Sequence, residues 1–375
     1  MIAKFRRETA GDHIALLLPN MGGGGAERVA LTLIDHFVAR GYSVDLVLMR
    51  AEGELLPLVP AEVQIVDLAV KRVRGLVGPL AAYLERAKPG AMQVSMWPLT
   101  VAAIVARAIQ RSPTRIVISD HAALSKEYGD KGFWHRQLLR WSMRLFYPKA
   151  EARVVVAADT AKDLARLSGL PERSFEVIYN PVAPPSETAE GPAGEQLWNG
   201  SGRRILNVGR MNSQKNQRLL LDAFARLVQR CDARLIILGD GVLRSELERQ
   251  AQDLGIAHRV EMPGFQLNLG SYYRSADLFV LSSDFEGYPL VLIEALHCGL
   301  PIVSTDCLSG PAEILDHGEF GRLVPCGDSA RLAEAMVEAL QLPANPERLR
   351  QRAAELTANA TDRYLELIVG NGKPA

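Results

Sequence analysis

The sequence predicts an α/β protein with two parallel-sheet domains, and three observations lead to that prediction. Short apolar runs of strand length alternate with amphipathic runs of helical spacing in both halves of the chain, which is typical of parallel sheets covered by helices. The chain has 375 residues, more than one hydrophobic core usually holds. A segment rich in Pro, Glu, Gly and Ala, residues 183–202, separates the two patterns and is expected to be an exposed linker.

The first half begins with a strand–helix–strand unit. The apolar run 14–19 predicts a buried strand, and the glycines at 22–25 predict a loop. The helical spacing after this loop predicts a helix from 26 to about 39. Gly41 ends that helix, and a second strand is expected at 44–48. Further strands are expected at 64–68, 93–96, 115–119 and 153–157.

The second half repeats the alternation. Its strands are expected at 204–208, 234–238, 260–262, 278–281 and 302–304. Helices are expected between most of them, including 217–229 and 242–254, and one long amphipathic helix is expected from about 346 to 369.

Two glutamates follow the strand at 278–281. Glu286 lies in a short loop, and Glu294 lies eight positions later, about two turns into an apolar helix. Ligands of open α/β sheets bind at the carboxyl ends of the strands, and backbone N–H groups at the start of a helix can receive a phosphate. Two carboxylates beside such a site suit a ligand that carries both a phosphate and hydroxyl groups.

This stretch resembles the motif of two glutamates separated by seven residues in retaining glycosyltransferases of family 4. That family has the GT-B fold, two facing Rossmann-like domains. The resemblance places Glu286 beside the donor sugar and Glu294 on the ribose hydroxyls of the sugar nucleotide. It also places the backbone of the intervening turn at the sugar, through Gly287, Tyr288, Pro289 and Leu290.

A second motif of the family resembles the loop after the strand at 204–208. Gly209, Arg210 and Lys215 lie there, at the same edge of the predicted sheet as the glutamates. The resemblance places both cations on the donor diphosphate, where negative charge develops as the nucleotide leaves.

Two more turns resemble parts of the family's nucleotide pocket. Gly239 lies in a Leu-Gly-Asp-Gly turn after the strand at 234–238, where glycine permits close backbone approach. Gly264 and Phe265 match the turn that meets the base, for which we expect uracil.

The first half contributes two candidates. The glycine loop, with Gly23 and Gly24, resembles the loop that the family places beside the donor phosphates and the acceptor. His121 ends a buried strand where the family has a histidine at the donor sugar. The residues expected to act on the sugar and the leaving diphosphate are Glu286, His121, Arg210 and Lys215.

The resemblance also implies a domain organisation. Residues 1–182 would form the acceptor-side domain and residues 203–350 the sugar-nucleotide domain, joined by the linker 183–202. Residues 351–375 would form a C-terminal helix and tail that cross back to the first domain.

Metals and cofactors are not expected. The sequence has no Asp-x-Asp motif and no His, Asp and Glu cluster at metal-binding spacing. None of the four cysteines forms a Cys-x-x-Cys pair, so zinc and a disulfide framework are disfavoured and a reducing compartment is expected.

Charge is unevenly distributed. Residues 1–182 hold 24 Lys and Arg against 18 Asp and Glu, and the rest of the chain holds 19 against 25. We expect the first half to face an anionic membrane surface or a lipid-linked phosphate. Nucleic acid is not expected, because no nucleic-acid reader motif is present. The basic, aromatic segment 126–149 is the candidate surface, with burial of its apolar face in the core as the alternative. With no apolar run long enough to span a bilayer and no signal peptide, a cytoplasmic protein at the inner face of the membrane is expected.

The resemblance therefore implies a retaining, metal-independent glycosyltransferase. It would move a hexose or N-acetylhexosamine from a nucleotide diphosphate donor, expected to be UDP-linked, to a polyprenyl-diphosphate-linked glycan. Two alternatives stay open: a sugar-nucleotide 2-epimerase of the same fold, and a non-catalytic subunit that binds nucleotide sugars.

Overall fold

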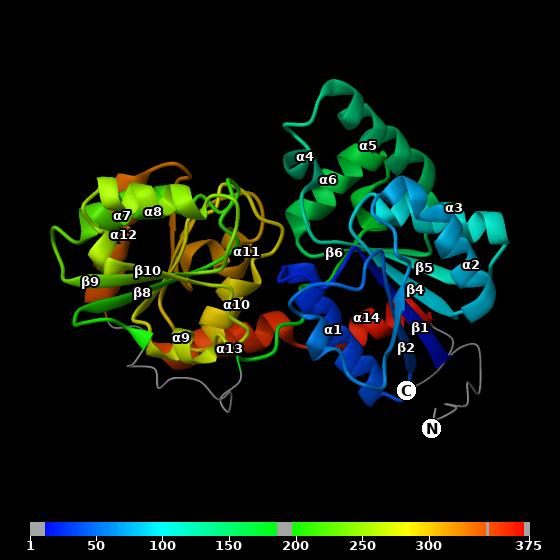
Figure 1. Ribbon diagram of the computed structural model, residues 1–375, viewed down its shortest axis with the longest axis horizontal. Coiled ribbons are helices and arrows are strands. Elements are labelled where there is room, and N and C mark those ends of the chain that lie inside the picture. Colours follow the sequence, from blue (N-terminus) through cyan, green and yellow to red (C-terminus); the bar gives the residue numbers. More distant parts are fainter. Residues whose placement is uncertain (1–11, 186–196, 343–344, 371–375) are drawn as a thin grey trace. The chain divides into compact units, whose positions relative to one another are not determined.

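The computed structural model describes residues 12–185, 197–342 and 345–370. It divides into two compact units, one formed by Met1–Pro181 with Asn359–Ala375 and the other by Val182–Ala358. Each unit has a parallel sheet with helices on its faces (Figure 1). None of the described helices is both long and apolar enough to cross a membrane.

The sheet of the first unit has seven strands in the order β3-β2-β1-β4-β5-β6-β7, all parallel. Strand β1 is completely buried and lies at the point where the strand order reverses. Its apolar residues form the centre of the unit because both faces of the sheet are covered. The strands are β1 (His13–Leu18), β2 (Ser43–Leu48), β3 (Gln64–Asp67), β4 (Ala91–Ser95), β5 (Arg115–Asp120), β6 (Ala152–Val155) and β7 (Glu176–Val177).

The helices of the first unit include one from the end of the chain. They are α1 (Gly25–Ala39), α2 (Val77–Ala87), α3 (Leu99–Gln110), α4 (Leu124–Glu127), α5 (Phe133–Phe146), α6 (Ala158–Ser168) and α14 (Ala360–Val369). Helix α14 buries Tyr364, whose hydroxyl lies 3.3 Å from the Ser119 Oγ atom at the end of β5. The Arg115 guanidinium donates to the Leu367 carbonyl over 3.2 Å. The prediction that the C-terminal helix returns to the first domain is confirmed.

The prediction of one continuous helix from 346 to 369 is wrong. Helix α13 (Pro346–Thr357) ends before α14 begins, and Asn359 between them has a left-handed backbone conformation with φ of 57°. Asparagine is one of the few residue types that adopt this conformation readily. Helix α13 belongs to the second unit, where Arg352 donates to the carbonyls of Glu313 and Ile314.

The sheet of the second unit has six parallel strands in the order β10-β9-β8-β11-β12-β13. They are β8 (Arg203–Val208), β9 (Ala233–Leu238), β10 (Val260–Gly264), β11 (Leu278–Leu281), β12 (Ile302–Thr305) and β13 (Arg322–Val324). The helices are α7 (Gln217–Leu227), α8 (Arg244–Asp253), α9 (Gly270–Ser275), α10 (Leu290–His297), α11 (Pro311–Ile314), α12 (Ser329–Gln341) and α13. The strand order reverses between β8 and β11, so the loops that follow these two strands lie side by side.

Part of the segment expected to be an exposed linker is packed. Trp198 is buried and donates from Nε1 to the Ser275 Oγ atom over 2.9 Å. Burial of the large indole ring is favourable, and the Gly- and Pro-rich composition of the segment did not indicate it. Residues 186–196, the centre of the expected linker, lie outside the described residues.

Candidate active site

The candidate site lies where the β8–α7 loop meets the β11–α10 loop. Three hydrogen bonds join the two loops at their backbones. The Ser282 hydroxyl donates to the Lys215 carbonyl over 2.9 Å, and the Asp284 N–H donates to the Gln214 carbonyl over 2.9 Å. The Gln214 side chain donates to the Phe285 carbonyl over 3.0 Å. The chain therefore fixes the relative position of the two loops that carry the predicted cations and carboxylates.

Lys215 and Glu286 form an ion pair across these loops. The Lys215 Nζ atom lies 2.6 Å from the Glu286 Oε1 atom, and the Ser283 hydroxyl donates to the same oxygen over 2.6 Å. The two charged side chains are only 17% and 6% exposed. The described residues offer no hydrogen bond to Oε2 of Glu286. One carboxylate oxygen and two ammonium protons thus remain for a ligand.

The backbone around Glu286 is held by the loop after β12. The Glu286 N–H donates to the Leu308 carbonyl over 2.7 Å, and the Ser309 N–H returns a bond of 3.1 Å to the Glu286 carbonyl. The Ser309 hydroxyl also donates to the Gly287 carbonyl over 2.8 Å. Sequence reasoning assigned no role to Leu308 or Ser309, because their contribution is a backbone position that residue types do not reveal.

Glu294 lies in the second turn of α10 and is buried. Its Oε2 atom accepts a hydrogen bond of 2.7 Å from the hydroxyl of Tyr273 on α9, a side chain only 1% exposed. The described residues offer no hydrogen bond to its Oε1 atom. Tyr273 was not predicted, because nothing in its sequence spacing relates it to Glu294.

The residues between the two glutamates contribute side chains to the core, while their backbone lies at the site. The side chains of Tyr288 and Leu290 are buried, and Pro289 precedes the first turn of α10. The backbone N–H groups of Tyr288 and Leu290 lie at the helix start, where the aligned peptide dipoles favour an anion.

Three predicted glycines are brought together beside this site. Gly239 has φ of 126°, and a Cβ atom there would lie 2.2 Å from the Gly209 carbonyl oxygen, so only glycine fits. The Gly239 N–H donates to the Gly264 carbonyl over 2.9 Å. The glycines at the ends of β8, β9 and β10 thus form one floor, with the half-buried Phe265 directly after it.

Arg210 is the second predicted cation of the β8–α7 loop. Its side chain is exposed, and no described residue forms a hydrogen bond or ion pair with its guanidinium. Its carbonyl accepts from the Gln217 side chain over 3.1 Å, which fixes its backbone. Arg210 therefore has all its donors available, in contrast to Lys215.

The predicted residues of the first domain lie in the other unit. None of the glycines at 22–25 has a positive φ, so the loop does not need glycine for its backbone conformation. Gly24 precedes α1, and the N–H of Gly22 is held by the Asn20 side chain at 3.1 Å. Gly23 lies between them without a side chain that would obstruct a ligand.

His121 follows β5, and its side chain contacts the hydroxyl group of Ser119. Its Nε2 atom lies 3.1 Å from the Ser119 Oγ atom, which in turn lies 3.3 Å from the Tyr364 hydroxyl. Burial lowers the pKa of His121 to about 4, and a hydrogen bond with the Asn180 side chain opposes this shift. The imidazole is therefore neutral near pH 7.

Asp120, the residue before His121, is buried as well. Burial raises its pKa to about 7, while the hydroxyl of Tyr147, which donates to Oδ2 over 2.9 Å, opposes the shift. Asp120 thus ties the end of β5 to the segment after α5.

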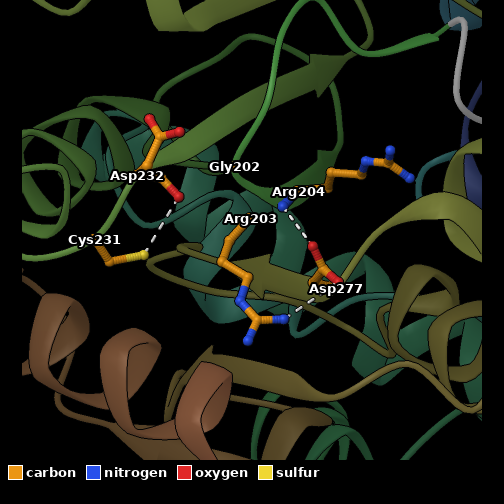
Figure 2. Close-up of a pocket in the computed structure, with 6 residues that line it drawn as sticks. All are labelled: Gly202, Arg203, Arg204, Cys231, Asp232 and Asp277. Atoms are coloured by element: carbon orange, nitrogen blue, oxygen red, sulfur yellow. Dashed lines mark hydrogen bonds and ion pairs between the residues drawn. The ribbon is translucent and has the colours of Figure 1, made fainter.

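A hollow on the second unit lies at the opposite edge of the sheet. Its walls come from the amino-terminal ends of β8, β9 and β11 (Figure 2). The Asp277 carboxylate there accepts a hydrogen bond of 2.7 Å from the backbone N–H of Arg204 and lies 3.8 Å from the Arg203 guanidinium. We assign it no function. Its lining residues are Gly202, Arg203, Arg204, Cys231, Asp232 and Asp277.

Comparison with known proteins agrees with this geometry. The family model Glycosyltransferase Family 4 matches residues 23–184, and the model Glycosyl transferases group 1 matches residues 193–356. A Campylobacter jejuni relative, N-acetylgalactosamine-N,N'-diacetylbacillosaminyl-diphospho-undecaprenol 4-alpha-N-acetylgalactosaminyltransferase, is 27% identical over 93% of this chain and 96% of its own.

Solved structures show the same fold. Anabaena HepE in complex with UDP and glucose has a TM-score of 0.75 at 22% identity, over 93% of this chain and 95% of its own. WaaG, a glycosyltransferase involved in lipopolysaccharide biosynthesis, has a TM-score of 0.72 at 18% identity, over 96% of this chain and 100% of its own. With both halves matched by glycosyltransferase models and the whole chain sharing the GT-B fold, the protein belongs to the family 4 glycosyltransferases.

Proposed function

We propose that the protein is a retaining glycosyltransferase that moves a hexose or N-acetylhexosamine from a UDP-linked donor to a polyprenyl-diphosphate-linked glycan. The observation that supports this most is the Lys215–Glu286 ion pair of 2.6 Å at the start of α10. It places a cation and a carboxylate together where a sugar diphosphate would need both. The C. jejuni relative is named for a diphospho-undecaprenol acceptor, and HepE was solved with UDP.

The donor would bind mainly to the second unit. Oε1 of Glu294 would accept hydrogen bonds from the ribose hydroxyls, while Lys215 and Arg210 would bind the diphosphate. Oε2 of Glu286 and the backbone of the following turn would bind the sugar. The glycine floor of Gly209, Gly239 and Gly264 would lie against the nucleotide, because glycine allows the ligand to approach the backbone.

The transfer itself would be a substitution at the anomeric carbon with retained configuration. The bond from that carbon to the β-phosphate oxygen breaks as the acceptor oxygen bonds on the same face. The acceptor proton passes to the departing diphosphate, so no side chain must act as a general base. The neutral His121 of the first unit would serve as a hydrogen-bond partner of the sugar.

The proposal includes no metal. Arg210, Lys215 and the start of α10 would provide the positive charge that stabilises the leaving diphosphate. Transfer should therefore proceed at an unchanged rate in the presence of a chelator. A rate that falls with the chelator and returns with added Mg²⁺ or Mn²⁺ would contradict this part.

The test is a thermal-shift screen with UDP, GDP, ADP and their sugar conjugates in a chelating buffer, followed by transfer assays. Stabilisation by UDP and one of its conjugates should be followed by transfer of that sugar to a polyprenyl-diphosphate glycan. NMR of the product should show the anomeric configuration of the donor. Stabilisation by none of the nucleotides, or an inverted product, would refute the proposal, and conversion of the donor alone would indicate an epimerase.

A further inference from the structure

We propose that the outer surface of helix α5 binds an anionic membrane, with its aromatic and leucine side chains in the bilayer interface and its arginines on lipid phosphates. This inference goes beyond the proposed function, because it depends on a surface of the first unit and on none of the donor-binding residues. It begins with exposure. Five of the thirteen exposed large hydrophobic side chains among the described residues lie on this one helix.

Four of these side chains form a single stripe. They are spaced four, three and four residues apart, which at about 100° per residue places them within an arc of roughly 60°. They are Trp134, Leu138, Trp141 and Leu145. The two indoles are 77% and 61% exposed. Exposing a contiguous apolar stripe to water is unfavourable, so such a stripe indicates an interaction surface.

The stripe is not needed for the core of the unit. The opposite side of α5 already buries Leu139 and Met143. The indole N–H of Trp97, from the loop after β4, donates to the Ser142 hydroxyl over 3.0 Å and fixes the helix further. Helix α5 is therefore fixed to the core by one side and exposes a second apolar face on the other.

A row of arginines lies on the side of the helix between the stripe and the buried Leu139 and Met143. Arg136, Arg140 and Arg144 follow one another at intervals of four residues and are all exposed. No described residue forms an ion pair or hydrogen bond with their guanidinium groups. The helix has no acidic residue, and segment 126–149 holds six Lys or Arg against two Asp or Glu. Long arginine stems can lie on an apolar surface while the charged ends reach phosphates.

An anionic bilayer fits this pairing better than another protein does. Tryptophan and leucine beside a basic row are typical of helices that lie in the membrane interface. A symmetric dimer through this face would place two unpaired arginine rows close together, which like-charge repulsion disfavours. Lipid headgroups instead offer a phosphate to each guanidinium.

Binding can be measured with the full-length protein and phosphatidylcholine vesicles with or without phosphatidylglycerol. The protein should sediment with the anionic vesicles, and less with neutral ones. Of the four tryptophans, Trp97 and Trp198 are buried, so fluorescence quenching by brominated acyl chains reports on Trp134 and Trp141.

Two variants separate the two parts of the surface. Leu138→Ser with Leu145→Ser keeps both indoles as probes and should weaken binding at least about tenfold through lost apolar burial. Replacing the three arginines by glutamine should weaken binding to anionic vesicles on the order of 100-fold, since each contributes about fivefold near an anionic surface. The control, Ile109→Ser with Val242→Ser, removes exposed apolar side chains elsewhere and should bind as the wild type does.

Several outcomes would overturn the inference. They are no binding by the wild type, equal binding to neutral and anionic vesicles, unquenched tryptophans, and a solution dimer that the leucine variant dissociates. The thermal shift by UDP should be unchanged in all these variants. Vesicle binding without a nucleotide shift would contradict only the proposed function, and a nucleotide shift without vesicle binding would contradict only this inference.

Discussion

Tyr273 donates a hydrogen bond of 2.7 Å to one oxygen of the Glu294 carboxylate, and both side chains are buried. The bond joins α9 to α10 and fixes the orientation of the carboxylate, so that the second oxygen is left for a ligand. Tyr273 is thus a positioning residue for the proposed ribose contact. Its own hydroxyl would not touch the donor.

Tyr273→Phe should weaken donor binding more than it slows turnover. A hydrogen bond to a charged group is worth about 1.5–3 kcal/mol, so we expect KM for the donor to rise roughly tenfold while kcat changes little. Steady-state kinetics over a range of donor concentrations would measure both. The neighbouring Tyr272→Phe is the matched control, because no described residue accepts a hydrogen bond from that hydroxyl. An equal effect of the two variants would contradict the positioning role.

The Lys215–Glu286 pair should contribute both to stability and to catalysis. Lys215→Met leaves a buried carboxylate without its cation, which we expect to cost about 3 kcal/mol of the free energy of unfolding. It also removes the positive charge that would stabilise the leaving diphosphate, so we expect kcat to fall about 100- to 1,000-fold. Denaturant titration and initial rates would measure the two effects.

A double variant separates these two contributions. Lys215→Met with Glu286→Leu removes both charges, so most of the lost stability should return while activity stays absent. Recovery of activity together with stability would show that Lys215 acts only through the fold. Glu286→Gln provides a further comparison, because an amide oxygen can still accept from the Ser283 hydroxyl.

Arg210 should matter for activity without mattering for stability. Its guanidinium is exposed and has no partner among the described residues, so Arg210→Gln should change the free energy of unfolding by less than about 0.5 kcal/mol. We expect kcat/KM to fall about 100-fold, because one of the two proposed diphosphate contacts is lost. Arg226→Gln, an exposed position on α7, is the control and should retain full activity. Equal activity of both variants would exclude Arg210 from the site.

The sequence predicts the parts of this fold that apolar runs define. Eleven expected strands have counterparts in the structure. The two that were missed, β7 and β13, are two and three residues long and have no apolar run of their own. The break at Asn359 was missed because the sequence there has neither glycine nor proline.

Charged loop residues of the site are predictable for a related reason. Parallel strands bring the loops after β8 and β11 to one edge, so Lys215 and Glu286 had to be neighbours once the strands were recognised. Tyr273 and Ser283 could not be found in this way, because each depends on the direction of a single side chain. For the segment that contains α5, the sequence left open whether the apolar face binds a membrane or lies in the core. Packing alone shows that Leu139 is buried while Trp141 is exposed.

Asp120 and His121 should make opposite contributions to the pH dependence of stability. The pKa of His121 is lowered to about 4, so the unfolded chain takes up a proton between pH 6.5 and 4 that the folded chain does not, and stability falls as the pH drops. The pKa of Asp120 is raised to about 7, so the folded chain keeps a proton that the unfolded chain loses between pH 3.8 and 7, and stability falls as the pH rises. In the shared window the two effects largely cancel.

Removing one member of the pair should therefore reveal the other. Asp120→Asn, which can still accept from Tyr147, should lose stability relative to the wild type as the pH falls below 6.5. His121→Asn should lose it as the pH rises towards 7. Each slope should be at most about 1.4 kcal/mol per pH unit, and smaller for the half-buried histidine. Urea denaturation at several pH values would measure the slopes, with exposed Asp130→Asn as the control. Single variants whose pH dependence matches the wild type would show that burial does not shift these two groups.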